Sequence, residues 1–174
     1  MDAQAYRDKL TKWDQESREE RVLRWQQIKP ASYGSLLPDL LWEYIVEAVN
    51  MYIRGHPTGT VLLCAAAIEI ILADQIKAKS ANTISKKIRR GRELGLLEED
   101  EATRIDELWK LRNELIHAHA GQLKERAMKL LPAEWASPSL YFLAGLPGSI
   151  DADALKCLQT ARDLAVKFYG EKEQ

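Results

Sequence analysis

The segment that opens at Thr58 or Gly59 and ends near Lys77 is apolar on almost every side when it is wound as a helix. After Gly59 it reads T-V-L-L-C-A-A-A-I-E-I-I-L-A-D-Q-I-K. A helix that is hydrophobic all round is stable in water only when other elements cover it. We therefore predict that this segment is the central and most buried helix of a helical bundle.

Several other segments carry apolar residues three and four positions apart, which is the helical period. They span residues 38–53, 83–94, 105–121, 122–131 and 151–168, with candidate N-caps at Asn82 and Asp151. No stretch of the sequence alternates polar and apolar residues between turn signals, as a strand would. The sequence therefore predicts an all-α fold, a bundle of about five to seven helices.

The first 34 residues differ from the rest of the chain because charged residues dominate them. Their few apolar residues include Tyr6, Leu10, Trp13 and Trp25, and Pro30 interrupts the helical pattern. We predict that residues 1–34 form a charged, mostly exposed helical extension. We also expect this extension to lay an aromatic edge on a bundle formed by residues 35–174.

The net charge and the cysteine content of the chain limit the kinds of ligand that it is expected to bind. The 174 residues carry a formal net charge of -1, so no overall positive field attracts nucleic acid, although a local basic patch would suffice. Cys64 and Cys157 each lie in an apolar helical pattern, which predicts two reduced core thiols. Because the sequence has no tight Cys/His cluster, we expect no metal and no cofactor.

The location of the protein is suggested by its N-terminus and by its longest apolar run. The polar N-terminus does not resemble a signal peptide. The apolar run from Val61 to Ala73 contains Glu69 and is shorter than the roughly 20 residues that a membrane-spanning helix needs. These features predict a cytoplasmic protein without membrane association.

The helix predicted at residues 105–121 combines three polar residues that suit phosphate chemistry. It reads I-D-E-L-W-K-L-R-N-E-L-I-H-A-H-A-G and contains Arg112, Asn113 and His117, after an acidic cluster at residues 98–101 that suits a helix N-terminus. Asn113 and His117 share one face, whereas Arg112 falls within the apolar arc and His119 lies close to it. Histidine acts as acid or base near neutral pH, and the planar guanidinium of arginine fits phosphate oxygens. These groups suit metal-independent phosphodiester cleavage with a ribose 2′-hydroxyl as nucleophile.

Such cleavage needs a base, an acid and a cation that stabilises the phosphorane. One copy of this helix supplies one motif histidine and one motif arginine, and two copies facing each other across a two-fold axis supply two of each. We therefore expect a homodimer with a composite site. In the structural alternative, Arg112 is a paired residue, His117 lies on the surface near the helix end and His119 contacts the following loop.

Glu69 and Arg112 are charged residues within apolar patterns. An ionised side chain in such surroundings is costly unless it is paired. We therefore predict an ion pair between Glu69 and Arg112. In the alternative interpretation, Glu69 lies near a helix edge or bonds a backbone group.

A second candidate site is the cluster of basic residues in the short helix at residues 83–94. The cluster consists of Lys86, Lys87, Arg89, Arg90 and Arg92. Basic side chains grouped on one helix can contact the phosphates of RNA. The alternative is a solvated helix face with no ligand.

The motif and its context resemble the HEPN superfamily of helical-bundle ribonucleases and nucleotide-binding proteins. The resemblance rests on Arg112, Asn113 and His117 late on a helix, after the apolar helix V-L-L-C-A-A-A-I-E-I-I-L, and covers roughly residues 38–168. It implies a homodimer in which Arg and His of both protomers line a basic cleft. Catalytic members are metal-independent endoribonucleases, often toxins or antiviral effectors. Some toxins carry a modifiable Tyr two positions after the His, where this chain has His119.

The sequence therefore predicts an endoribonuclease of HEPN type with RNA as substrate. The predicted role is that of a toxin or defence effector restrained by an antitoxin or another partner protein. Arg112, Asn113 and His117 are its expected catalytic residues, supported by Glu69 and His119. The alternative is a non-catalytic helical module that binds a partner protein or a nucleotide. A third possibility is a ligand-binding regulator whose pocket is lined by Trp135–Phe142.

Overall fold

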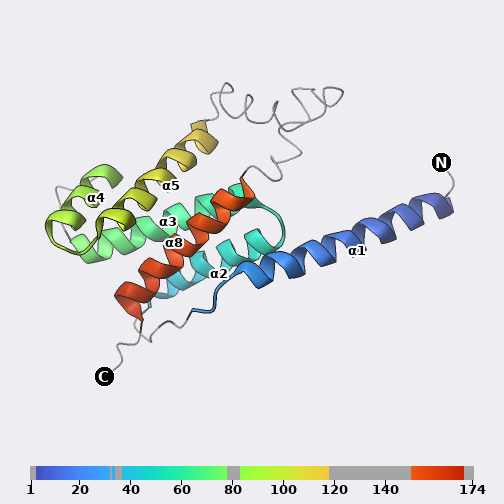
Figure 1. Cartoon of the computed structure of the whole chain (residues 1–174), viewed down its shortest axis with the longest axis horizontal. Helices are drawn as coiled ribbons and strands as arrows, with labels where there is room; N and C mark the ends of the chain where they lie inside the picture. The colour runs from blue at the N-terminus through green and yellow to red at the C-terminus, as the bar shows by residue number, and fades with distance from the viewer. Residues whose placement is uncertain (1–2, 32, 34–36, 78–82, 118–149, 171–174) are drawn as a thin grey trace.

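A computed structural model describes residues 3–31, 33, 37–77, 83–117 and 150–170 of the chain (Figure 1). Within these residues there are six α-helices and no strand, which confirms the predicted all-α fold. The helices are α1 (Ala3–Gln27), α2 (Asp39–Ile53), α3 (Pro57–Ile76), α4 (Ile84–Glu93), α5 (Glu99–His117) and α8 (Asp151–Tyr169). The helix expected at residues 122–131 and the loop expected after it lie outside the described residues.

The core of the bundle is α3, as its composition predicts. It packs against α2, α4, α5 and α8 (Figure 1). Val61, Ile68 and Ile71 are fully buried, and only three residues of the helix, Glu69, Ala73 and Asp74, are exposed. Because four helices cover α3, its apolar faces are removed from water on nearly every side.

The length of α3 corrects one argument made from the sequence. The helix is 20 residues long, and by length and composition alone it passes as a candidate membrane span. The run from Val61 to Ala73 is therefore shorter than the apolar helix to which it belongs. Half of this candidate span is buried inside the bundle, which is the position of a core helix.

The helices on either side of α3 follow the predicted period closely. Leu41, Ile45, Ala48 and Tyr52 of α2 are buried at spacings of four, three and four. In α8 the buried residues are Ala154, Cys157, Leu158, Thr160, Ala161, Leu164, Ala165 and Tyr169. Asp151 is the first residue of α8 rather than its cap, because Ile150 occupies the N-cap position.

Local backbone chemistry sets the ends of α4. Thr83, and not Asn82, is its N-cap, and the Thr83 hydroxyl accepts a hydrogen bond from the backbone N–H of Lys86 at 3.4 Å. Near its end, Gly91 is buried, and a Cβ placed there would lie 2.8 Å from the Leu97 side chain. Gly95 follows with a φ of 67°. These two glycines allow a short turn to pack Leu97 directly against α4.

The two thiols lie where the sequence places them. Cys64 on α3 and Cys157 on α8 are both buried and free. Burial raises the pKa of the Cys64 thiol well above its usual range, with a smaller contribution from Cys157. Burial also raises the pKa of Cys157, to about 12. Both side chains therefore remain neutral thiols at physiological pH and behave as small core residues.

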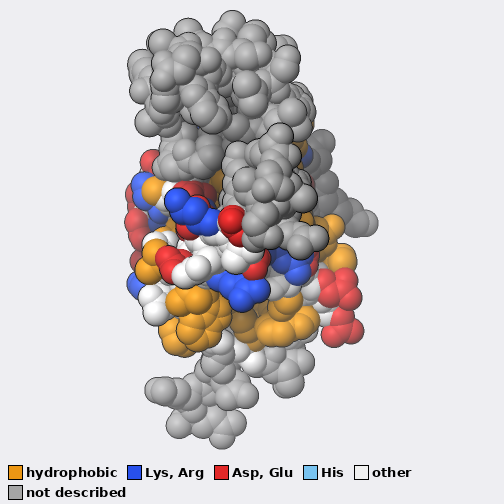
Figure 2. Space-filling view, turned by 90° about the vertical axis from the view of Figure 1, so that its right-hand side faces the viewer, with side chains coloured by type: hydrophobic (Ala, Val, Ile, Leu, Met, Phe, Trp, Pro, Cys, Tyr) orange, Lys and Arg blue, Asp and Glu red, His pale blue; other side chains and the backbone are white. Residues whose placement is uncertain are grey.

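The N-terminal helix α1 extends away from the bundle and contacts it near its C-terminal end (Figure 1). There Arg24 binds Asp151 at 3.4 Å, and the Tyr52 hydroxyl donates to Gln27. Trp25 lies on another side of the helix and is 66% exposed, so the expected aromatic edge is wrong for this residue. Figure 2 views the molecule from the side to which α1 extends and shows hydrophobic side chains gathered on part of that face. The proposed division at residues 34 and 35 stays a prediction.

Adjacent leucines at the start of α2 provide a matched test of this packing. Leu41 is fully buried, whereas Leu40 is 55% exposed. We expect Leu41→Ala to lower the free energy of unfolding by about 2–5 kcal/mol, because it removes transfer energy and leaves a cavity. Leu40→Ala should change it by less than about 1 kcal/mol. Urea denaturation measures both values, and equal losses would contradict the described register of α2.

Candidate functional site

The helix that carries the motif, α5, is positioned by its buried side. Ile105, Leu108 and Leu111 are buried at spacings of three, and α5 packs on α3, α4 and α8. At its start, the backbone N–H of Glu98 donates to the Glu101 carboxylate at 2.8 Å. That contact satisfies a donor at the helix N-terminus, where acidic side chains also complement the helix dipole, as the sequence predicted.

Arg112 lies among the apolar residues of α5, where the sequence places it, and is half-buried. Its guanidinium carbon lies 4.8 Å from the centroid of the Trp109 ring. Its Nη1 also donates a hydrogen bond to Asn113 Oδ1 at 3.0 Å. A cation over an indole face and bonded to a neighbouring amide is oriented while it keeps its full positive charge.

The predicted ion pair between Glu69 and Arg112 is wrong. Glu69 is 48% exposed, on the exposed strip of α3, and its Oε1 pairs with Lys87 Nζ of α4 at 3.4 Å. Glu69 does have a basic partner on another helix, as one interpretation of the sequence expects, but the partner is Lys87 and not Arg112. The physical reason is that α4 covers this side of α3 and brings Lys87 to Glu69.

The remaining motif residues are only partly described. His117 is the last residue of α5, one turn after Asn113, so the backbone places both on one face of the helix. The side chain of His117 and the whole of His119 lie outside the described residues, as do Trp135–Phe142. Arg112, Asn113 and the backbone of His117 therefore define the described part of the candidate site.

The basic cluster of α4 is largely balanced by carboxylates. Lys87 is only 13% exposed and pairs with Glu69. Arg89 and Arg90 both pair with Glu93, at 3.7 Å and 3.1 Å. Arg92 pairs with Glu99, and the Lys86 side chain is exposed. Arg89 and Arg90 remain accessible, at 75% and 48%, because their pairs lie on the surface, where such contacts are weak.

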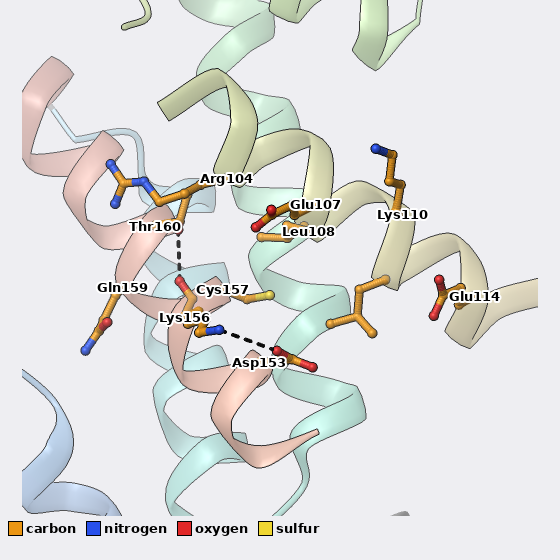
Figure 3. Close-up of a pocket in the computed structure, with 11 residues that line it drawn as sticks. Arg104, Glu107, Leu108, Lys110, Glu114, Asp153, Lys156, Cys157, Gln159 and Thr160 are labelled. Atoms are coloured by element: carbon orange, nitrogen blue, oxygen red, sulfur yellow. Dashed lines mark hydrogen bonds and ion pairs between the residues drawn. The ribbon is translucent and has the colours of Figure 1, made fainter. Parts of the chain in front are cut away.

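A cavity between α5 and α8 is a feature that the sequence analysis missed. It has a volume of about 310 Å³ and is lined by acidic, basic and apolar side chains of both helices (Figure 3). Arg104 borders it and pairs with Asp100 and Asp163 at 3.4 Å each, while its Nε is buried without a partner among the described residues. Arg112 and Asn113 do not line this cavity. A sequence signal existed in the polar residues spaced along one side of each helix, but only the packing of α5 on α8 brings them together.

Among the described residues, no group of three or more His, Cys, Asp or Glu side chains is arranged to hold a metal ion.

No family model, curated protein or solved structure matches the chain. The resemblance to HEPN proteins therefore stays a prediction that rests on the motif and its helical setting.

A double-mutant cycle tests which basic side chain forms an ion pair with Glu69. We expect Glu69→Ala to change the free energy of unfolding by less than about 1 kcal/mol, because the pair with Lys87 is partly exposed. The effects of Glu69→Ala and Lys87→Ala should be non-additive, whereas those of Glu69→Ala and Arg112→Ala should add. Chemical denaturation of the three single and two double variants measures this. Coupling of Glu69 to Arg112 rather than to Lys87 would contradict the described pair and support the ion pair predicted from the sequence.

Proposed function

We propose that this protein is a metal-independent endoribonuclease of HEPN type that acts as a homodimer. The observation that carries the proposal is the orientation of Arg112 by Trp109 and Asn113 on the helix that ends at His117. The family that the motif resembles carries it in a helical bundle, and the described part of this chain is an all-α bundle. The guanidinium is oriented by neutral groups, so its charge remains available for an anionic substrate.

In the proposed reaction, the 2′-oxygen of a ribose attacks the adjacent phosphorus and the 5′-oxygen leaves. His117 of one protomer removes the 2′-hydroxyl proton, and His117 of the other donates a proton to the leaving oxygen. Arg112 stabilises the negative charge of the phosphorane, and Asn113 fixes the guanidinium. The products carry a 2′,3′-cyclic phosphate and a 5′-hydroxyl.

The proposal extends to the cellular role of the protein. Catalytic members of the family that the motif resembles are often toxins or antiviral effectors. We therefore propose a cytoplasmic toxin or antiviral defence effector held by an antitoxin or another partner protein.

Cleavage of a mixed RNA substrate in EDTA tests the proposal. We expect wild type to cut, and His117→Ala and Arg112→Ala to lower the rate by about 100-fold or more, because general acid–base and electrostatic catalysis each contribute at that level. Asn113→Ala should have a smaller effect. Lys110→Ala is the matched control, because this lysine lies on α5 with its side chain 70% exposed and pairs with Asp106.

Circular dichroism must first show that each variant is folded, since Arg112 is half-buried. No cleavage by wild type would contradict the proposal for the tested RNA. Equal cleavage by wild type, His117→Ala and Arg112→Ala would locate the activity elsewhere.

We propose that Arg89 and Arg90 of α4 contact the RNA backbone, while Lys86 and Lys87 lie beside this contact. The double variant Arg89→Glu with Arg90→Glu should weaken RNA binding by about tenfold or more and reduce the log–log salt slope by about 1.4 for two lost contacts on a single strand. Lys12→Glu with Arg18→Glu on α1 changes the net charge equally and should have little effect. Fluorescence anisotropy at several salt concentrations measures both, and equal weakening would exclude a local contact.

The alternative function is a non-catalytic module that binds a partner protein or a nucleotide. It is favoured by large apolar side chains exposed near the junction of α1 and α2. Val22, Trp25, Leu40 and Trp42 are each 48–66% exposed. Growth arrest on expression that depends on His117 would separate the enzyme from this module.

A further inference from the structure

The N-terminal part of α1, which projects from the bundle, carries a pattern of apolar and charged residues that suits a contact with another helix. α1 is 25 residues long, and its C-terminal part meets the bundle while the rest projects from it (Figure 1). Ser17, Arg21 and Arg24 are half-buried at spacings of four and three. They identify the face of α1 that is turned toward the bundle.

The same face continues toward the N-terminus with apolar residue types. Further steps of four, three and four positions lead from Ser17 to positions 13, 10 and 6, which are Trp13, Leu10 and Tyr6. Alternating spacings of three and four are the seam of a two-helix coiled coil. A helix of otherwise polar sequence gains stability when such a seam packs against another helix.

Charges flanking the seam are arranged to complement a second copy of α1. Arg7 and Lys9 lie on either side of the seam in the first half, and Asp14 and Glu16 take the corresponding positions one heptad later. In an antiparallel pair that sets Leu10 against Trp13 of the second copy, Arg7 lies beside the second Asp14 and Lys9 beside the second Glu16. The two-fold axis repeats each contact, giving four flanking pairs of opposite charge.

Contacts within one chain do not occupy these carboxylates strongly. Asp14 binds Arg18 at 2.7 Å and Glu16 binds Lys12 at 3.8 Å, and all four side chains are more than half exposed. Exposed pairs of this kind contribute little and leave the carboxylates open to further partners.

The position of the bundle selects the antiparallel orientation. Each bundle packs on the C-terminal part of the same helix face that forms the seam. A parallel partner helix would therefore run toward that bundle and bring the second bundle into the same space. An antiparallel partner places the two bundles at opposite ends of the helix pair.

We infer that α1 pairs antiparallel with α1 of a second copy through the seam of Tyr6, Leu10 and Trp13, flanked by reciprocal pairs of Arg7 with Asp14 and Lys9 with Glu16. This contact is separate from the α5 contact of the proposed ribonuclease and does not depend on RNA cleavage.

Light scattering after size-exclusion chromatography of the full chain, over a range of concentrations, tests the inference. Arg7→Glu with Lys9→Glu should remove the α1 contact and lower the molar mass of wild type, and so should Asp14→Lys with Glu16→Lys. Mixing the two double variants should restore it, as should all four changes in one chain. Thr11→Glu with Gln15→Glu, at positions away from the seam, is the control and should leave the mass unchanged.

Cysteine crosslinking tests the orientation, because Cys64 and Cys157 are buried. Leu10→Cys mixed with Trp13→Cys should form mainly the mixed disulfide-linked dimer. Preferential linking of Leu10→Cys to itself would overturn the antiparallel register. Wild type that is monomeric at every concentration, or a mass unchanged by both charge reversals, would overturn the pairing, whatever the RNA cleavage assay shows.

Discussion

The structure depends on the burial of α3 by its four neighbours. A 20-residue helix with Val61, Ile68 and Ile71 fully buried cannot remain in water uncovered, so α2, α4, α5 and α8 are arranged around it. This constraint also fixes which sides of the other helices face outward. The orientation of α5 that leaves Arg112 and Asn113 half-buried follows from the burial of Ile105 and Leu108 against the core.

Residue periodicity is sufficient to predict the all-α fold, the core position of α3 and the place of Arg112 among the apolar residues of α5. Each of these depends on one helix and its own period. The partner of Glu69 depends instead on which helix covers the exposed strip of α3, and periodicity does not contain that information. The cavity beside Arg104 escaped prediction for the same reason, because two helices distant in sequence form it.

The candidate site combines two kinds of positive charge with different surroundings. The basic residues of α4 form surface pairs with acids, such as the contact between Arg90 and Glu93. Arg112 is held by an aromatic ring and a neutral amide. Neutral orienting groups preserve the full charge of a guanidinium, whereas carboxylates offset it. This difference distinguishes Arg112 from the arginines of α4 as a candidate for binding a transient anion.

The attachment of α1 has a mechanical consequence. At 25 residues the helix is about 38 Å long, and it is fixed near one end by Arg24 on Asp151 and by Gln27 on Tyr52. It therefore acts as a lever arm whose fulcrum includes the first residue of α8. A rotation of about 10° at that fulcrum displaces the N-terminal tip by about 6 Å, because the arm from Arg24 to Ala3 is about 32 Å long. A small rearrangement at the first turn of α8 is thus converted into a large displacement at the far end of the molecule.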